Sequence, residues 1–226
     1  MIFNNKGHKN VENQKPKQNY SLILEETIKK ISKAGIRPTL LLHACCAPCS
    51  SYVLEYLSTY FDITLLFYNP NISPEEEYIF RENELRRLIG EMPLPDGITV
   101  ISQKYDPQEF LNIAQGLENL AEGGERCKKC YRLRLSRTAE IASKNGFDYF
   151  STTLSISPYK NAEWLNTIGA DEGEKCGVSY LFSDFKKKNG YKRSCELSEQ
   201  YGLYRQNYCG CEVSKKAAEE KSKKNV

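Results

Sequence analysis

The sequence predicts an α/β fold in which helices flank a parallel sheet. Short apolar runs alternate with stretches of helical periodicity through most of the chain, as expected where strands are joined by helical crossovers. The chain has 226 residues, of which 40% are hydrophobic and 27% are charged. That length and composition are typical of one soluble globular domain with a sizeable core. We therefore expect a single α/β domain over residues 19–213.

The first half of the chain predicts three of the strands. An expected helix over 22–33 stops near Gly35, and the apolar run Thr39-Leu40-Leu41-Leu42-His43-Ala44 follows it. Such a continuous apolar run predicts a strand buried on both faces. The helix predicted over 74–89 begins with three glutamates, which suit the positive end of a helix dipole. The other elements predicted here are a helix over 50–60 and strands over 63–68 and 98–102.

The second half predicts a helix over 127–145, closed by Gly146, and a fourth strand over 148–151. Beyond that strand we expect a helical and loop region that carries a Cys-Gly-Cys motif at 209–211. The two chain ends, residues 1–18 and 214–226, are polar and offer little to bury. Both ends are therefore predicted to be mobile.

Composition limits where the protein works and what it binds. No apolar run approaches the roughly 20 residues needed to cross a bilayer, and the beginning of the chain carries no secretory pattern. We therefore expect a cytoplasmic protein without a membrane partner. In a reducing compartment, nine cysteines indicate metal ligands or redox thiols rather than a disulfide scaffold. The net charge of +3 does not by itself predict nucleic-acid binding.

Two cysteine motifs together offer four thiolates. Cys127 and Cys130 fall in the first turn of a predicted helix, where free N–H groups and neighbouring cations favour thiolates. This spacing alone also fits a thioredoxin-like dithiol or half of a zinc site. Cys45 and Cys46 follow the first strand, where the chain leaves the pleat and both thiols can turn the same way. Four thiolates are the usual complement of a 4Fe–4S cluster, although one of these cysteines could instead be a core residue.

The other cysteines and the histidine of the first strand have different predicted roles. Cys49 is either a spare ligand for a second metal or an ordinary helix residue. Cys209 and Cys211 are separated by one glycine, and a disulfide between them would be strained and easily reduced, which favours a redox pair over metal ligation. His43 is expected to be a buried imidazole with satisfied hydrogen bonds rather than a ligand. We assign no role to two isolated cysteines, Cys176 and Cys195.

Two further segments are candidates for substrate binding. Residues 184–194 interleave aromatics with cations, which suits RNA phosphates and unpaired bases, although a solvated loop before an ordinary helix would look the same. The Asn-Pro-Asn segment at 69–71 follows the second strand, and loops at that edge of a parallel sheet line the ligand crevice. The chain has no GxGxxG, Walker or Ser-Gly-Gly-x-Asp-Ser motif, so nucleotide use has no support.

Taken together, these motifs resemble the QueH-type epoxyqueuosine reductases of tRNA queuosine biosynthesis. Some of the motifs are weak individually, but in this order they are specific. The matching segments are His-Ala-Cys-Cys-Ala-Pro-Cys (43–49), Tyr-Asn-Pro-Asn-Ile (68–72), Glu-Gly-Gly-Glu-Arg-Cys-Lys-Lys-Cys-Tyr (122–131), Thr-Thr-Leu-Ser-Ile-Ser-Pro-Tyr-Lys (152–160), Asp-Phe-Lys-Lys-Lys-Asn-Gly-Tyr (184–191) and Tyr-Arg-Gln-Asn-Tyr-Cys-Gly-Cys (204–211).

The resemblance implies a fold, a reaction and a substrate. The fold is similar to the Rossmann-like (HUP/PP-loop-like) sheet of ATP-dependent tRNA-modifying enzymes, without their nucleotide loop. The reaction is a two-electron reduction of the epoxide of epoxyqueuosine, at the wobble position of a tRNA, to the alkene of queuosine and water. The electron donor is left unidentified.

The resemblance also implies roles for particular residues. Cys209 and Cys211 are a redox-active pair, and Cys49, at a position where family members vary, could help to hold an additional iron. The implied ligands of a 4Fe–4S cluster are Cys45, Cys46, Cys127 and Cys130. As a hypothesis, the residues that contact the hydroxylated ring are Tyr68, Asn69 and Asn71, and those that hold anticodon phosphates are Lys186, Lys188 and Arg193.

Two other functional classes fit parts of the sequence. A non-catalytic RNA-binding module with a structural zinc would also use clustered cysteines. A tRNA-thiolation enzyme on the same fold would require ATP, and the missing nucleotide loop argues against it.

Overall fold

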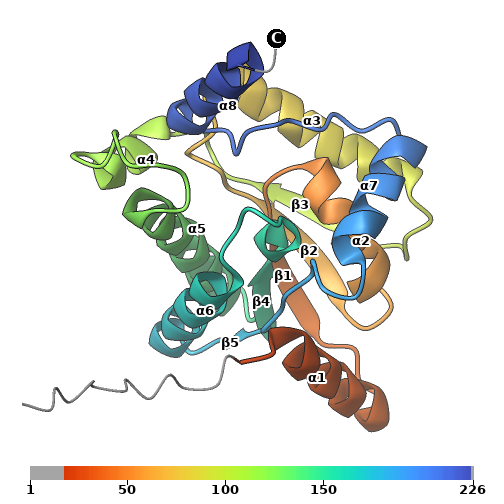
Figure 1. The fold of residues 1–226 in the computed structure, drawn as a ribbon. Coiled ribbons are helices and arrows are strands. Elements are labelled where there is room, and N and C mark those ends of the chain that lie inside the picture. Colours follow the sequence, from red (N-terminus) through yellow and green to blue (C-terminus); the bar gives the residue numbers. More distant parts are fainter. Residues whose placement is uncertain (1–17, 225–226) are drawn as a thin grey trace, which may run out of the picture.

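The computed structural model describes residues 18–224, and it confirms the predicted α/β architecture (Figure 1). Its five-stranded sheet has the order β3-β2-β1-β4-β5, and each neighbouring pair of strands is parallel. The strand order reverses at β1, and a reversal of this kind opens a crevice at the carboxyl ends of the strands. The strands are β1 (Thr39–Ala44), β2 (Asp62–Phe67), β3 (Thr99–Ser102), β4 (Tyr149–Thr152) and β5 (Ser179–Tyr180).

Helices cover both faces of the sheet (Figure 1). Because successive side chains of a strand point to opposite faces, Leu40 and Leu42 pack against α1, α2 and α3, while Leu41 packs against α5 and α6. All three leucines are fully buried, which explains the unbroken apolar run of β1. The helices are α1 (Tyr20–Ala34), α2 (Ala47–Leu57), α3 (Glu75–Glu91), α4 (Pro107–Ala114), α5 (Glu125–Lys144), the 3₁₀ turn η1 (Thr153–Ile156), α6 (Ala162–Cys176), α7 (Gly190–Gln200) and α8 (Glu212–Lys224).

Each element predicted within residues 22–151 is present, but the sequence analysis did not predict α4, α6 or β5. Helix α6 contains Gly169 and Gly173, and interior glycines weaken the helical signal. A Cβ atom at Gly169 would lie 2.3 Å from the ring of Tyr180, and one at Gly173 would lie 2.7 Å from the carbonyl oxygen of Val178. The glycines therefore allow α6 to approach β5 closely.

The C-terminal segment differs from its prediction. The sequence analysis expects a mobile tail from Ser214, but the structure places residues 212–224 in helix α8. Alanine, glutamate and lysine, which dominate this segment, are strong helix formers, and Ser214 is buried at its start. The predicted mobile segment at 1–18 lies almost entirely outside the described residues. The domain boundaries remain predictions, and no helix among residues 18–224 is both long and apolar enough to span a membrane.

Candidate active site

The end of β1 brings three thiols together. Cys45 and Cys46 follow the strand, and Cys46 is the N-cap of α2 in an extended conformation. Pro48 then occupies the first turn of α2, a position that needs no backbone N–H donor. As a result, the sulfur atoms of Cys45, Cys46 and Cys49 all lie within 4.8 Å of one another, and those of Cys45 and Cys46 are 3.7 Å apart. This sharp exit from the strand lets adjacent cysteines face one site.

Hydrogen bonds among these three thiols favour the thiolate form of one of them, Cys46. Hydrogen bonds from Cys45 and Cys49 lower the pKa of Cys46 well below its usual value, despite its burial. The hydrogen bond to Cys46 raises the pKa of Cys45 to about 12, and hydrogen bonds to both neighbours raise the pKa of Cys49. Thiolates are the form that binds soft metals. This group is therefore suited to a metal that would replace the shared protons.

The Cys-x-x-Cys motif lies in the first turn of α5, as predicted. Cys127 packs in the same apolar cluster as Cys45 and Cys46, and its sulfur accepts a hydrogen bond from the backbone N–H of Gly123 at 3.3 Å. Cys130 packs with Cys211 in a neighbouring cluster. Neither Cys127 nor Cys130 belongs to the group of sulfurs that lie within 4.8 Å of one another in the described chain. The structure thus brings the two motifs to one end of the sheet but places Cys49, rather than the α5 cysteines, beside Cys45 and Cys46.

A buried arginine lies among the three cysteine motifs. The side chain of Arg134, one turn beyond Cys130 on α5, is 3% exposed, and no carboxylate pairs with it among residues 18–224. Although burial opposes the charge, the negative forms of Cys130, Cys45 and Cys209 raise the pKa of Arg134. An unpaired buried cation is costly, and negative charge on the neighbouring sulfurs would lower that cost.

The Cys-Gly-Cys loop connects α7 to α8 and carries two free thiols whose sulfurs are 3.5 Å apart. The hydrogen bond between the two sulfurs lowers the pKa of Cys209 well below its usual value, and the ammonium of Lys160 lowers it further against the effect of burial. The same hydrogen bond and burial raise the pKa of Cys211. Of the two thiols, Cys209 is therefore the one favoured as a thiolate, which is the form that reacts in thiol–disulfide exchange.

The Asn-Pro-Asn loop after β2 supports the Cys-Gly-Cys loop. The carbonyl oxygen of Cys209 accepts hydrogen bonds from the side chains of Asn71 and Arg81, both at 3.4 Å. The backbone N–H of Ser73 donates to the carbonyl of Gly210 at 3.0 Å. These contacts fix the Cys-Gly-Cys loop against the carboxyl end of the sheet.

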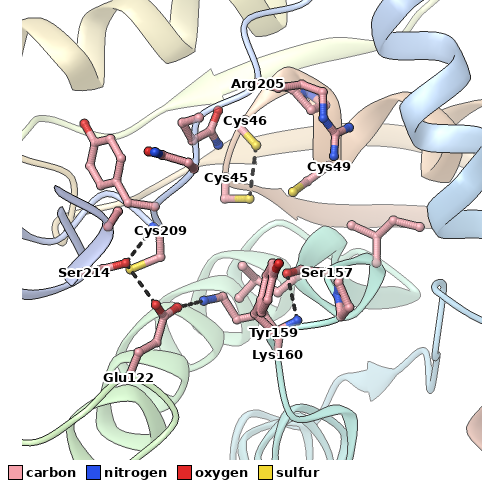
Figure 2. A pocket seen from close by; sticks show the side chains of 18 of the residues that line it. Cys45, Cys46, Cys49, Glu122, Ser157, Tyr159, Lys160, Arg205, Cys209 and Ser214 are labelled. Carbon is pink, nitrogen blue, oxygen red and sulfur yellow. Dashed lines mark hydrogen bonds and ion pairs between the residues drawn. The ribbon is translucent and has the colours of Figure 1, made fainter. Parts of the chain in front are cut away.

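A cavity of about 560 Å³ lies between these motifs. The sulfurs of Cys45 and Cys49 lie on one side of it, and Lys160 extends from the opposite side toward Glu122 (Figure 2). Its volume is in the range of small-ligand sites. The cations that line it outnumber the single carboxylate, that of Glu122. They are Arg81, Arg134, Lys160, Arg205 and Lys221.

The residues predicted to contact the modified base do not line this cavity. Tyr68 donates a short hydrogen bond to Glu109, and Asn69 donates to the carbonyl of Ala44 at 2.9 Å. Asn71 holds the Cys209 carbonyl, as described above. In the described chain all three side chains are thus engaged by other parts of the protein.

The predicted phosphate-binding cations also lie outside the cavity lining. Each of them forms an ion pair with a carboxylate of the protein. The pairs are Lys186 with Asp184, Lys188 with Glu25, and Arg193 with Glu55 and Glu196. The prediction for His43 is confirmed: it is buried and hydrogen-bonds Thr152 and the carbonyl of Tyr68.

Sequence reasoning missed the cations that line the cavity. Lys160 and Glu122 lie within motifs quoted above, but they are 38 residues apart in the chain, and no spacing rule pairs them. Arg134 lies two turns into α5 and looks like an ordinary helix residue in the sequence. Arg205 belongs to the motif at 204–211, but nothing in that motif predicts that its side chain lines a cavity. Only the folded structure shows that these groups share one cavity.

Comparisons with known proteins agree on one family. The family described as "Epoxyqueuosine reductase QueH" matches residues 40–217. The chain is 44% identical over 201 residues to the epoxyqueuosine reductase QueH of Streptococcus pyogenes serotype M1, which covers 88% of this chain and 79% of that protein. It is 41% identical over 215 residues to the protein of the same name from Staphylococcus epidermidis, and the match covers 93% of this chain and 90% of that protein. The chain is also 38% identical over 182 residues to the epoxyqueuosine reductase QueH of Thermotoga maritima, and this match covers 78% of this chain and 90% of that protein.

Proposed function

Because the chain belongs to the epoxyqueuosine reductase QueH family, we propose that it reduces epoxyqueuosine in tRNA to queuosine within this cavity. The reaction opens the epoxide, forms a carbon–carbon double bond and releases the oxygen as water. It consumes two electrons and two protons. The substrate and the free thiols both favour the cytoplasm as the place of reaction.

The observation that carries this proposal is the convergence of three cysteine motifs on one cationic cavity. Thiols from the β1 exit and the Cys-Gly-Cys loop line it, and α5 contributes the Cys-x-x-Cys motif behind it. Oxidation of the Cys209 thiolate and the Cys211 thiol to a disulfide would release two electrons, which is the number that the reduction consumes, and one proton, and water supplies the second proton. Their adjacency in a supported loop fits this role.

The donor set also fits an iron–sulfur centre. The thiols are buried or nearly so, and Arg134 offers the positive charge that a buried thiolate-bound cluster requires. When bound, a 4Fe–4S cluster supplies electron transfer at low potential. We propose Cys45, Cys46, Cys127 and Cys130 as its ligands. Cys49, which lies beside Cys45 and Cys46, is available for an additional iron.

The mouth of the cavity suits an RNA. Arg205 and Lys221 offer charges for phosphates, and the exposed ring of Tyr159, also on the lining, offers a stacking surface for an unpaired base. We keep three further cations as proposed phosphate contacts, namely Lys186, Lys188 and Arg193. Because each of them is ion-paired with a carboxylate of the protein, RNA phosphates would have to replace those carboxylates. An external donor that we do not identify must supply the electrons.

The first test is the metal and sulfide content of anaerobically purified protein. We expect about four irons and four acid-labile sulfides per chain and conversion of epoxyqueuosine to queuosine in tRNA, detected by mass spectrometry after nuclease digestion. Zinc without sulfide, and no conversion, would support the RNA-binding module instead.

Serine variants then test the ligand assignment. We expect Cys127→Ser to lose the cluster and turnover. The matched control, Cys176→Ser, changes a cysteine at the last residue of α6 outside the cavity lining, so it retains both. Full iron content in Cys127→Ser would remove Cys127 from the ligands.

A further inference from the structure

A chain of hydrogen bonds joins the Cys-Gly-Cys loop to a buried lysine (Figure 2). The backbone N–H of Cys209 donates to Ser214 Oγ at 3.1 Å, and Ser214 Oγ donates to Glu122 Oε2 at 3.0 Å. Lys160 Nζ donates to Glu122 Oε1 at 2.7 Å. The three side chains come from α8, from the loop before α5 and from the loop after η1. Their convergence holds the ammonium of Lys160 in a fixed relation to Cys209.

The ammonium of Lys160 carries a positive charge and has N–H donors that are not engaged by the described residues. Its side chain is 9% exposed. Although burial opposes the charge, the negative forms of Cys209 and Tyr131 and the Glu122 carboxylate raise its pKa. Among residues 18–224, Glu122 is the one hydrogen-bond partner of this ammonium, and an ammonium has three N–H donors. Two donors are therefore available to a ligand in the cavity.

The other cavity cations are engaged differently. Arg81 bonds Glu77 and the carbonyl of Cys209, while Arg205 bonds Ser198. Arg134 is enclosed by the cysteine motifs. Arg81 also keeps one unpartnered nitrogen, Nη2, but Glu77 and the Cys209 carbonyl already fix its guanidinium. Lys160 combines two N–H donors that have no partner among residues 18–224 with a position across the cavity from Cys45 and Cys49.

We propose that Lys160 is a further catalytic residue, whose ammonium donates a hydrogen bond to the epoxide oxygen as the ring opens, and that Glu122 positions it. This inference rests on the proposed reductase function. When the first carbon–oxygen bond breaks, negative charge collects on oxygen, and a preorganised donor in a dry site stabilises that charge. With two electrons delivered by the reductant, the second carbon–oxygen bond breaks and the carbons form the double bond. The oxygen takes up two protons and leaves as water, and Lys160 is unchanged.

The test separates catalysis from binding. For the holoenzyme of Lys160→Gln, we expect the rate constant at saturating epoxyqueuosine-tRNA to fall about 100-fold or more, while the dissociation constant for that tRNA and the iron content stay within about threefold. Lys160→Arg restores a donor and recovers part of the rate. The matched control is Lys144→Gln, an exposed lysine in the last turn of α5, which keeps the wild-type rate. A wild-type rate in Lys160→Gln, or a loss confined to the dissociation constant, would overturn the inference.

A second variant covers the case in which Lys160→Gln loses its iron. Glu122→Gln leaves the lysine in place but removes the carboxylate that fixes it, so we expect a rate about tenfold lower with unchanged tRNA affinity. An unchanged rate would overturn the positioning role. Failure of the wild-type enzyme to convert epoxyqueuosine would instead refute the proposed function, so the two failures are distinguishable.

Discussion

Arg134 shows how one residue can define the chemistry of a site. Its guanidinium is buried beneath thiols from three separate segments and has no carboxylate partner in the described chain. The groups nearby that can carry the balancing negative charge are the thiols of Cys130, Cys45 and Cys209. A residue with this role is expected to govern how tightly the thiolates hold a metal.

Replacing Arg134 by Met should weaken metal retention. Removal of the buried positive charge destabilises the surrounding thiolates, and outer groups of this kind are worth about 10-fold or more in metal affinity. The measurement is the rate at which iron passes to a chelator. Arg132→Met, on the same helix but paired with Asp171 and Glu172, is the control. Equal rates of iron loss for both variants would show that Arg134 does not balance the metal site.

Gly210 is the residue on which the conformation of the Cys-Gly-Cys loop depends. Its φ angle is +115°, and a Cβ atom there would lie 2.7 Å from Ile72 Cγ1. Gly210→Ala should lower the free energy of unfolding by about 1–3 kcal/mol and also reduce turnover, because the cysteines shift. Gly35→Ala also has a positive φ but open space around it, so it should cost about 1 kcal/mol and leave turnover intact. Denaturant unfolding and the tRNA assay measure both effects, and full turnover in Gly210→Ala would contradict this account.

The cysteine motifs were predictable because each places its thiols close together along the chain. The bend after Ala44 and the first turn of α5 are local features that Pro48 and the helix start impose. The pairing of Lys160 with Glu122 depends on two loops that meet only in the fold. Local sequence patterns do not predict that these two loops lie in contact.

At the scale of elements, the central strand β1 is easier to predict from the sequence than the edge strand β5 and the helix α6 that packs on it. β1 is an unbroken apolar run because it is buried on both faces, and that signal is strong. β5 has two residues and α6 contains packing glycines, so neither displays its usual pattern. The glycines that let α6 pack closely against β5 also weaken the helical pattern by which α6 could be predicted from the sequence.

Helix α8 should contribute to RNA binding more than to stability. No described residue of α8 after Ser214 is buried, yet Ala217, Ala218 and Lys221 line the cavity. Deleting residues 215–226 should change the free energy of unfolding by less than about 1 kcal/mol while weakening tRNA affinity about tenfold, because several lysines are lost. Denaturation and filter-binding measure the two effects. Unaltered affinity would place α8 outside the RNA interface.

At the scale of the molecule, two cationic surfaces compete as the RNA interface. Arg205→Gln with Lys221→Gln removes two charges from the cavity mouth, so the slope of log affinity against log salt should fall by about 2. Lys186→Ala with Lys188→Ala should weaken binding less, because both lysines already pair with Asp184 and Glu25. A larger effect of the second pair would move the interface to the face formed by α1 and the loop before α7.

The central claim is that the cavity performs a two-electron reduction of epoxyqueuosine. The most direct measurement adds counted amounts of a low-potential chemical reductant to anaerobic, iron-loaded protein and epoxyqueuosine-tRNA, and then quantifies queuosine nucleoside by mass spectrometry. We predict one queuosine for every two electrons, and none with Cys209→Ser protein. Iron-loaded wild-type protein that leaves epoxyqueuosine unchanged at every level of reductant would contradict the account.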